Sequence, residues 1–340
     1  MTIRDVAAAA GVSVGTVSRA LNKKGRVSKS AISAVAEAAS RLGYEPDAIA
    51  QSMRQQSTKV VGMLISDVAN PFFASVIRAA ETRLRKAGYV LLIGNTDNDA
   101  RRESELVDMF RRRRVDGMIL GPCESDNAEL LEQLNRSYFP SVAFDRSFVS
   151  GGGVHVDHRK GAQLSTRFLL NLGHERIALM SSSDRLRPGR ERIEGFRTAH
   201  DDAGIEVDPK LIFAEPFAME FVFSEALSLV NSPNPPTAYI CLGTRILAGV
   251  LQALKQAGKR VPEDASVISI GDSDLARLHA PAITAISWDL EMVGEVLAEV
   301  MLKRLMPETE VGDDPVTVST HLIQRNSCAP LARRLAVKGS

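Results

Sequence analysis

The hydrophobic residues near the N-terminus recur at helical spacing and predict three short helices. Two of these helices lie within residues 2–22 and meet at Gly11, where a tight turn suits a residue without a side chain. The third covers residues 29–43. Ser13 and Ser28 stand where a hydroxyl can cap the helix that follows. The apolar stripes that pack this head together are Ile3, Val6 and Ala10, then Val17 and Leu21, then Ile32, Val35, Ala39 and Leu42.

From residue 59 onward, short apolar runs alternate with amphipathic segments. This alternation predicts parallel sheets with helices on both faces. The pattern restarts after the glycine run 151–153, so we expect two similar α/β lobes with a ligand cleft beyond the carboxyl ends of their strands. The expected strands are 60–66, 89–95, 116–121, 141–147, 176–182, 211–216, 238–243, 266–271, 283–289 and 316–327, and the expected helices are 71–88, 100–114, 127–137, 161–173, 191–204, 221–231, 245–258 and 290–306.

The composition is that of a globular chain of two or three domains, with 340 residues of which 44% are hydrophobic. We expect a cytoplasmic protein, because the sequence has neither a long apolar run nor a secretory signal at its start. Its three cysteines are odd in number and far apart, which argues against zinc and disulfides. The net charge is only +1, but residues 1–60 carry nine basic and four acidic groups. A basic head on a mildly acidic body is typical of a DNA-binding module attached to another domain.

The outward face of the second helix carries small, polar and basic residues, which suits the DNA major groove. Residues 12–22, VSVGTVSRALN, resemble the recognition segment VSxxTVSRxLN of the LacI/GalR family of bacterial transcription regulators. The resemblance extends over residues 2–330 and implies an all-α helix-turn-helix head plus a two-lobed α/β effector domain like the periplasmic binding proteins, with parallel sheets. The implied DNA-binding residues are Thr2, Ser13, Val14, Gly15, Thr16, Ser18, Arg19, Asn22, Arg26, Tyr44, Ala50 and Met53.

Residues 45–58 have no apolar core of their own and, taken alone, predict an interdomain linker. The resemblance instead implies a hinge helix that forms on DNA, with Met53 as a wedge in the minor groove. Asp47 replaces the asparagine that the family favours and fits a cap for that helix. The expected domains are a head (1–44), a hinge (45–58), an effector domain (59–330) with lobe 1 at about 59–159 plus 290–318 and lobe 2 at about 160–289 plus 319–330, and a tail (331–340).

Three motifs near strand ends, at 67–73, 144–146 and 192–196, resemble those with which the family holds its effector. An alternative role for Arg192 is an interlobe salt bridge with Asp145. Gly243-Thr244 and Gly271-Asp272 stand where the family has polar pairs that often bind sugar hydroxyls, so we expect a less polar or smaller effector than a hexose. The implied effector-binding residues are Asn70, Phe72, Phe73, Asp145, Arg192, Phe217, Asp272 and Trp288.

The sequence therefore predicts a ligand-responsive transcriptional regulator, a repressor, that binds pseudo-palindromic double-stranded operator DNA. We expect a homodimer, and a tetramer remains open. We also expect the protein to bind a small-molecule effector, but no cofactor, metal or membrane. Two alternatives remain. A solute-binding protein of the periplasmic type shares the lobes but calls for a signal peptide. A cytoplasmic α/β sugar-metabolising enzyme calls for a phosphate loop or a nucleophile–base pair, and the sequence offers neither motif, so we expect no enzyme.

Overall fold

The computed structural model describes the chain except for residues 23–24, 45–56, 124–129, 131, 133, 135, 137–138, 147–152, 215–218, 307–313 and 332–340, and the side chains of 219–221. The described chain divides into two compact units, Met1–Lys59 and Val60–Ser340. Each unit has its own cluster of buried apolar residues, so the two are described separately.

The first unit is a three-helix head that packs around Val6, Val17 and Val35, each at most 1% exposed. Burying one such side chain stabilises a fold by about 1.5–3 kcal/mol. The prediction that Ile32 belongs to this core was wrong, because its side chain is 44% exposed and Ala38 is buried instead. The helices are α1 (Ile3–Ala10), α2 (Val14–Leu21) and α3 (Lys29–Leu42).

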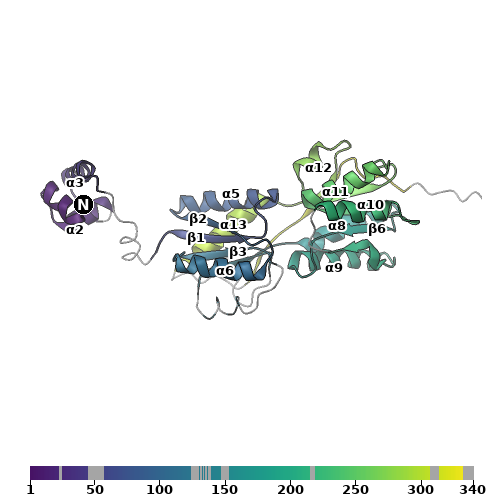
Figure 1. The fold of residues 1–340 in the computed structure, drawn as a ribbon, viewed down its shortest axis with the longest axis horizontal. Helices are drawn as coiled ribbons and strands as arrows, with labels where there is room; N and C mark the ends of the chain where they lie inside the picture. Colours follow the sequence, from purple (N-terminus) through teal and green to yellow (C-terminus); the bar gives the residue numbers. More distant parts are fainter. Residues whose placement is uncertain are drawn as a thin grey trace, which may run out of the picture. The chain divides into compact units, whose positions relative to one another are not determined.

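The first lobe of the second unit is a six-stranded sheet in the order β11-β5-β4-β3-β1-β2, with every pair parallel. Helices α5 and α6 lie on opposite faces of this sheet, and α13 packs along α5 (Figure 1). The elements are β1 (Val60–Ile65), α5 (Pro71–Lys86), β2 (Val90–Asn95), α6 (Ala100–Arg112), β3 (Gly117–Leu120), β4 (Ser141–Phe144), β5 (Gly153–Val156), α13 (Leu290–Arg304) and β11 (Val316–Val318).

The second lobe has the strand order β12-β10-β9-β8-β6-β7, parallel except for the β10–β12 pair. Helices α8 and α9 pack together, as do α10 and α11. The elements are α8 (His158–Asn171), β6 (Ile177–Met180), α9 (Arg187–Asp202), a 3-10 turn (Pro209–Leu211), β7 (Ile212–Phe213), α10 (Met219–Val230), β8 (Ala238–Leu242), α11 (Gly243–Gln256), β9 (Ser266–Ile270), α12 (Asp274–Leu278), β10 (Thr284–Ser287) and β12 (His321–Ile323).

The chain crosses between the lobes three times, after β5, after β10 and after β11. The prediction of one strand over 316–327 was wrong: the segment holds two short strands that join different sheets. The first and third crossings are bonded to each other. The Asp157 N–H donates to the Val318 carbonyl at 3.0 Å, and the Thr320 hydroxyl donates to the Asp157 carbonyl at 3.2 Å.

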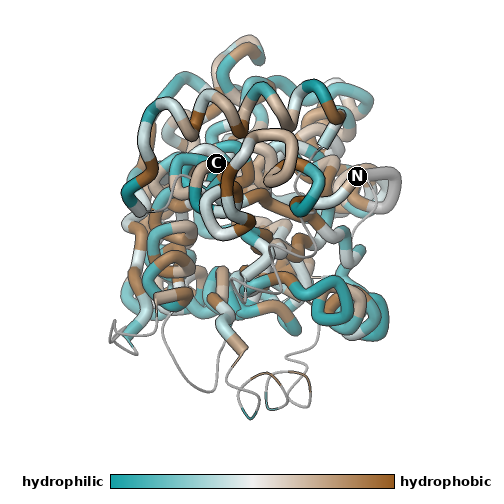
Figure 2. Tube along the Cα trace, turned by 90° about the vertical axis from the view of Figure 1, so that its left-hand side faces the viewer, coloured by the Kyte–Doolittle hydropathy of each residue, from teal (hydrophilic) through white to brown (hydrophobic). Residues whose placement is uncertain are grey.

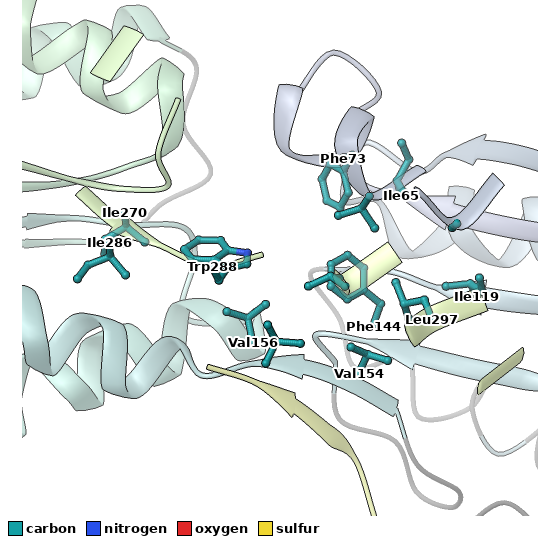
Figure 3. Packing of buried hydrophobic residues seen from close by; sticks show 14 of the residues in the cluster. Ile65, Phe73, Ile119, Phe144, Val154, Val156, Ile270, Ile286, Trp288 and Leu297 are labelled. Carbon is teal, nitrogen blue, oxygen red and sulfur yellow. The ribbon is translucent and has the colours of Figure 1, made fainter. Parts of the chain in front are cut away.

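Hydrophobic and hydrophilic residues alternate along the helices, as expected of helices that pack one face on a sheet (Figure 2). One cluster of buried apolar residues includes members of both lobes. Trp288, in the second crossing, lies between Ile270 and Ile286 on one side and Phe73 and Phe144 on the other (Figure 3). The lobes therefore meet through apolar as well as polar contacts.

Candidate effector site and DNA-binding head

Asp145 is the centre of a buried polar network where the two lobes meet. It directly follows β4, has a left-handed backbone (φ 49°), and is 2% exposed. Its carboxylate accepts from the Val156 N–H at 2.8 Å, from His158 at 3.0 Å and from the Arg187 guanidinium at 3.3 Å. Arg187 begins α9, so Asp145 of lobe 1 is bonded to lobe 2. Each oxygen of this buried carboxylate therefore has at least one donor.

His158 links Asp145 to Arg192. Its Nε2 lies 3.0 Å from the Asp145 carboxylate and its Nδ1 lies 3.0 Å from Nη2 of Arg192. Because a guanidinium can only donate, Nδ1 must accept and Nε2 must carry the proton. The imidazole is therefore neutral, in one defined tautomer. Arg192 also donates through Nη1 to the Ser182 hydroxyl at 3.2 Å.

The pKa values of this network agree with that assignment. Burial lowers the pKa of His158, and the charges of Arg192 and Arg187 add to this effect against the opposing charge of Asp145. Burial raises the pKa of Asp145, but His158, the Val156 N–H and Arg187 together hold it below its ordinary value. Burial lowers the pKa of Arg192 to about 10, which leaves the guanidinium charged at neutral pH.

An aromatic group borders the polar network. The ring of Phe72 stacks on Phe144 with centroids 6.0 Å apart, and its edge meets Trp288 at the same distance. Trp288 in turn lies edge-on to the His158 ring at 5.8 Å. Phe73 is 4% exposed and packs beneath Phe72 and Phe144. Phe72 keeps part of its surface exposed and offers an apolar face to a ligand. We call Phe72, Asp145, His158, Arg192 and Trp288 the interlobe site.

A second ion pair joins the lobes near this site. Asp67, after β1, contacts Arg245 near the start of α11 at 2.7 Å. The side chains of Asp67 and Arg245 are 31% and 55% exposed, so this pair is far better solvated than the Asp145–Arg187 pair. Exposed ion pairs contribute about 0–1 kcal/mol. The Asp145 network is therefore the stronger polar link between the lobes.

Several predicted effector residues are engaged within their own lobe. The Asn70 side chain caps α5 by accepting from the Phe72 N–H at 3.1 Å. Asp272 lies 2.8 Å from Arg325 and 3.0 Å from Arg277. Burial raises the pKa of Asp272, but its interactions with these two arginines outweigh burial and hold the pKa below the ordinary value. Phe217 lies outside the described residues.

The alternative that Arg192 forms a salt bridge with Asp145 was wrong, because Arg187 takes that place and His158 separates the other two. Sequence reasoning identified neither Arg187 nor His158 as part of this network. Both residues lie at the first position of a helix, Arg187 in α9 and His158 in α8, and the helices predicted over 191–204 and 161–173 start too late to include them.

A hollow of about 440 Å³ lies elsewhere in lobe 2, near the amino end of β6, and is lined by Arg176, Phe196, His200 and Asp208 among others. None of the interlobe-site residues lines it. Two of its lining residues, Arg176 and Asp208, form an ion pair at 2.9 Å. The hollow is therefore separate from the interlobe site.

In the head, α2 begins with exposed residues that suit a groove. Val14 is 41% exposed, and a Cβ on Gly15 would meet only the Ser13 hydroxyl, at 3.8 Å. The exposed Arg19 donates through Nε to the Gly15 carbonyl at 3.2 Å, and its two terminal nitrogens have no partner among the described residues. Thr16 is only half-buried.

Other residues predicted to bind DNA take part in local bonds. The Ser13 hydroxyl accepts from the Thr16 N–H at 3.2 Å, and Asn22 donates to the Ser18 carbonyl at 2.8 Å. The Thr2 hydroxyl donates to Asp5 at 3.0 Å. Arg26 is exposed, Tyr44 packs on the head core, and Ala50 and Met53, with Asp47 and most of the predicted hinge, lie outside the described residues.

Among the helices that the structure describes, none is long and apolar enough to cross a membrane. Residues 2–47 match the bacterial regulatory proteins of the lacI family, and residues 166–328 match a periplasmic binding protein-like domain. The HTH-type transcriptional repressor PurR of Glaesserella parasuis serovar 5 is 33% identical over 318 residues, covering 93% of each chain. PurR of Vibrio vulnificus is 32% identical over 307 residues, covering 89% of this chain and 92% of its own.

Solved structures of similar proteins cover between 78% and 97% of this chain. The transcriptional regulator CelR in complex with cellobiose has a TM-score of 0.73 and 27% identity, covering 96% of this chain and 99% of its own. A putative ribose operon repressor from Burkholderia thailandensis has a TM-score of 0.69 and 30% identity, covering 78% and 98%. The lac repressor dimer bound to operator and the anti-inducer ONPF has a TM-score of 0.86 over 97% and 99%, but at 23% identity this likeness shows the fold alone.

Proposed function

The chain belongs to the lacI family of bacterial regulatory proteins, and from this membership we infer that it is a transcriptional repressor controlled by a small-molecule effector. Its relatives named PurR are transcriptional repressors, and CelR was solved with a sugar. We propose that α2 reads operator DNA in the cytoplasm and that the interlobe site binds the effector. The observation that carries the DNA-binding proposal is the exposed start of α2.

The exposed surface of α2 supports major-groove reading by a small set of contacts. Arg19 presents terminal nitrogens that can donate to the O6 and N7 atoms of guanine, and Val14 can contact a thymine methyl group. Gly15, which lies near both residues in the helix, adds no side chain to this surface. One head therefore reads few bases. Two heads of a homodimer on a pseudo-palindromic operator would supply the remaining specificity.

The interlobe contacts support control by lobe closure. Both Asp145 and Asp67 of lobe 1 bond to arginines of lobe 2, and a change in the angle between the lobes would alter these two ion pairs. A ligand that binds between the lobes changes operator affinity only as far as it prefers one lobe angle over another. The crossings after β5, β10 and β11 are the segments about which that angle can change.

Binding of the full-length chain to the DNA upstream of its own gene tests this function. We expect a sequence-specific complex by gel shift at moderate salt, weakened about tenfold or more in Arg19→Gln because a base contact of this kind contributes about 1–3 kcal/mol. Arg41→Gln is the matched control, since it removes the same charge from an exposed position on α3. Equal losses in both variants, or no specific complex, would contradict base reading by α2.

A further inference from the structure

We propose that the effector carries an anionic oxygen group, a carboxylate or a phosphate, which accepts hydrogen bonds from Arg192 and Trp288. The proposal rests on the proposed effector function of the interlobe site and adds the chemical class of the ligand. It follows from which polar atoms of the site have partners in the protein and which do not.

Arg192 is a buried guanidinium without a carboxylate partner among the residues that the structure describes. It is 5% exposed, and it donates to a hydroxyl and to a neutral imidazole nitrogen. The acids nearest to it, Asp145 and Glu191, both bond to Arg187 instead. Buried charges in proteins are normally paired, because the lost hydration is costly. An anion at the site would supply the missing partner.

Arg146 shows what a paired arginine looks like in the same fold. It is 2% exposed, and its two terminal nitrogens donate to both oxygens of Glu103, at 2.5 and 3.4 Å. Among the described residues, the Nε atoms of Arg146 and Arg192 both have no partner. The difference between the two arginines is therefore the carboxylate, which Arg146 has and Arg192 does not.

Two further buried polar atoms of the site have no partner among the described residues: Nε1 of Trp288 and the hydroxyl of Ser181. Trp288 lies against His158, which bonds to Arg192, and Ser181 precedes the serine that accepts from Arg192. An indole N–H and a guanidinium N–H can only donate. The ligand must therefore offer acceptors at this position.

The acceptors next to Arg192, by contrast, already have donors. Asp145 accepts from three donors, and Nδ1 of His158 accepts from Arg192. Asp272, at the end of the neighbouring strand, forms ion pairs with two arginines, although its Oδ1 has no hydrogen-bond partner among the described residues. A ligand rich in hydroxyl donors would therefore find few free acceptors beside Arg192. The exposed part of Phe72 instead favours a flat apolar body that bears the anion.

The first test needs no ligand and compares Arg192→Met with Arg146→Met in the full-length chain. Removing an unpaired buried charge should raise the melting temperature, whereas removing Arg146 leaves Glu103 buried and unpaired and should lower it. Opposite signs for the two variants support the proposal. A fall in melting temperature in Arg192→Met as large as that in Arg146→Met would overturn it, because the protein alone would then satisfy the charge of Arg192 without a ligand.

The second test uses benzoate and phenyl phosphate with benzamide as the matched neutral probe. Trp288 is the only tryptophan of the chain, so its fluorescence reports binding at this site directly. We expect at least one anion to change the emission at millimolar concentration, with affinity about tenfold or more lower in Arg192→Gln, since a hydrogen bond to a charged group contributes about 1.5–3 kcal/mol. The response to each anion distinguishes a carboxylate from a phosphate ligand.

Binding of benzamide as tight as benzoate, or no response to either anion, would overturn the anionic class while leaving an effector site in place. Failure of the proposed function has a different signature: the full-length chain would form no specific DNA complex in the gel shift, whatever the fluorescence shows. An anion that binds in wild type and in Arg192→Gln with equal affinity would also overturn the proposal.

Discussion

The buried Asp145–Arg187 pair should dominate the polar link between the lobes, and Asp145→Asn tests this. At 3.3 Å and an effective dielectric constant of about 20, the gross attraction is about 5 kcal/mol. Breaking a buried pair costs about 3–5 kcal/mol; we expect about 3, because Arg187 is 17% exposed and keeps its contact with Glu191 at 2.6 Å. For an effector domain of this size, that corresponds to a fall in Tm of about 6–12 °C.

Asp67→Asn is the matched control for this prediction, because it removes the charge from the exposed interlobe pair and keeps the oxygen that accepts from the Ala69 N–H at 2.9 Å. We expect it to cost about 1 kcal/mol or less. Differential scanning fluorimetry of both full-length variants at pH 7 gives the comparison. A double-mutant cycle with Arg187→Gln isolates the pair. The reasoning fails if Asp67→Asn costs as much as Asp145→Asn, or if the cycle shows no coupling.

Two further predictions concern pH and helix packing. Burial lowers the folded-state pKa of four histidines, His155, His158, His174 and His200, below the ordinary value of 6.5. As the pH falls, the unfolded chain therefore takes up protons first, so the stability should be full above pH 6.5 and decline towards pH 5. A constant Tm over that range would contradict this prediction. Gly195→Ala should lower the free energy of unfolding by about 1–3 kcal/mol and Tm by several degrees, because the new Cβ would lie 2.2 Å from the Arg159 carbonyl. Gly15→Ala is the control and should leave Tm within about a degree, because a Cβ there has room. Equal changes in Tm would refute the packing argument.

Much of the fold follows from the sequence pattern, because each helix hides one face and each inner strand hides both. The predicted helix 71–88 differs from α5 by two residues at its end, and 290–306 differs from α13 by two. One strand was predicted over β11 and β12, since both are short runs that contain apolar residues, although the lobe boundary expected at 318/319 from the family resemblance falls between them. Pairing between sheets is not encoded in local periodicity.

The interlobe site was harder to predict, because its bonds join residues far apart in the sequence. Asp145 and Arg192 were both identified from the sequence. The residues that contact Asp145 from lobe 2, His158 of α8 and Arg187 of α9, depend on how these two helices pack near the end of β4. Asp145, which bonds to His158, has a left-handed backbone after β4. That conformation is uncommon for a residue other than glycine and cannot be read from the motif alone.

The three crossings also set the order in which this protein can be completed during synthesis. Lobe 1 begins at β1, yet α13 and the edge strand β11 of its sheet are made only after most of lobe 2 has left the ribosome. Lobe 2 likewise waits for β12. Neither lobe can therefore reach its full sheet as a nascent chain, and a truncation before Val316 leaves both unfinished. Chains that end early should be recognised by cellular proteases as unfolded throughout the effector domain, and not in one lobe alone.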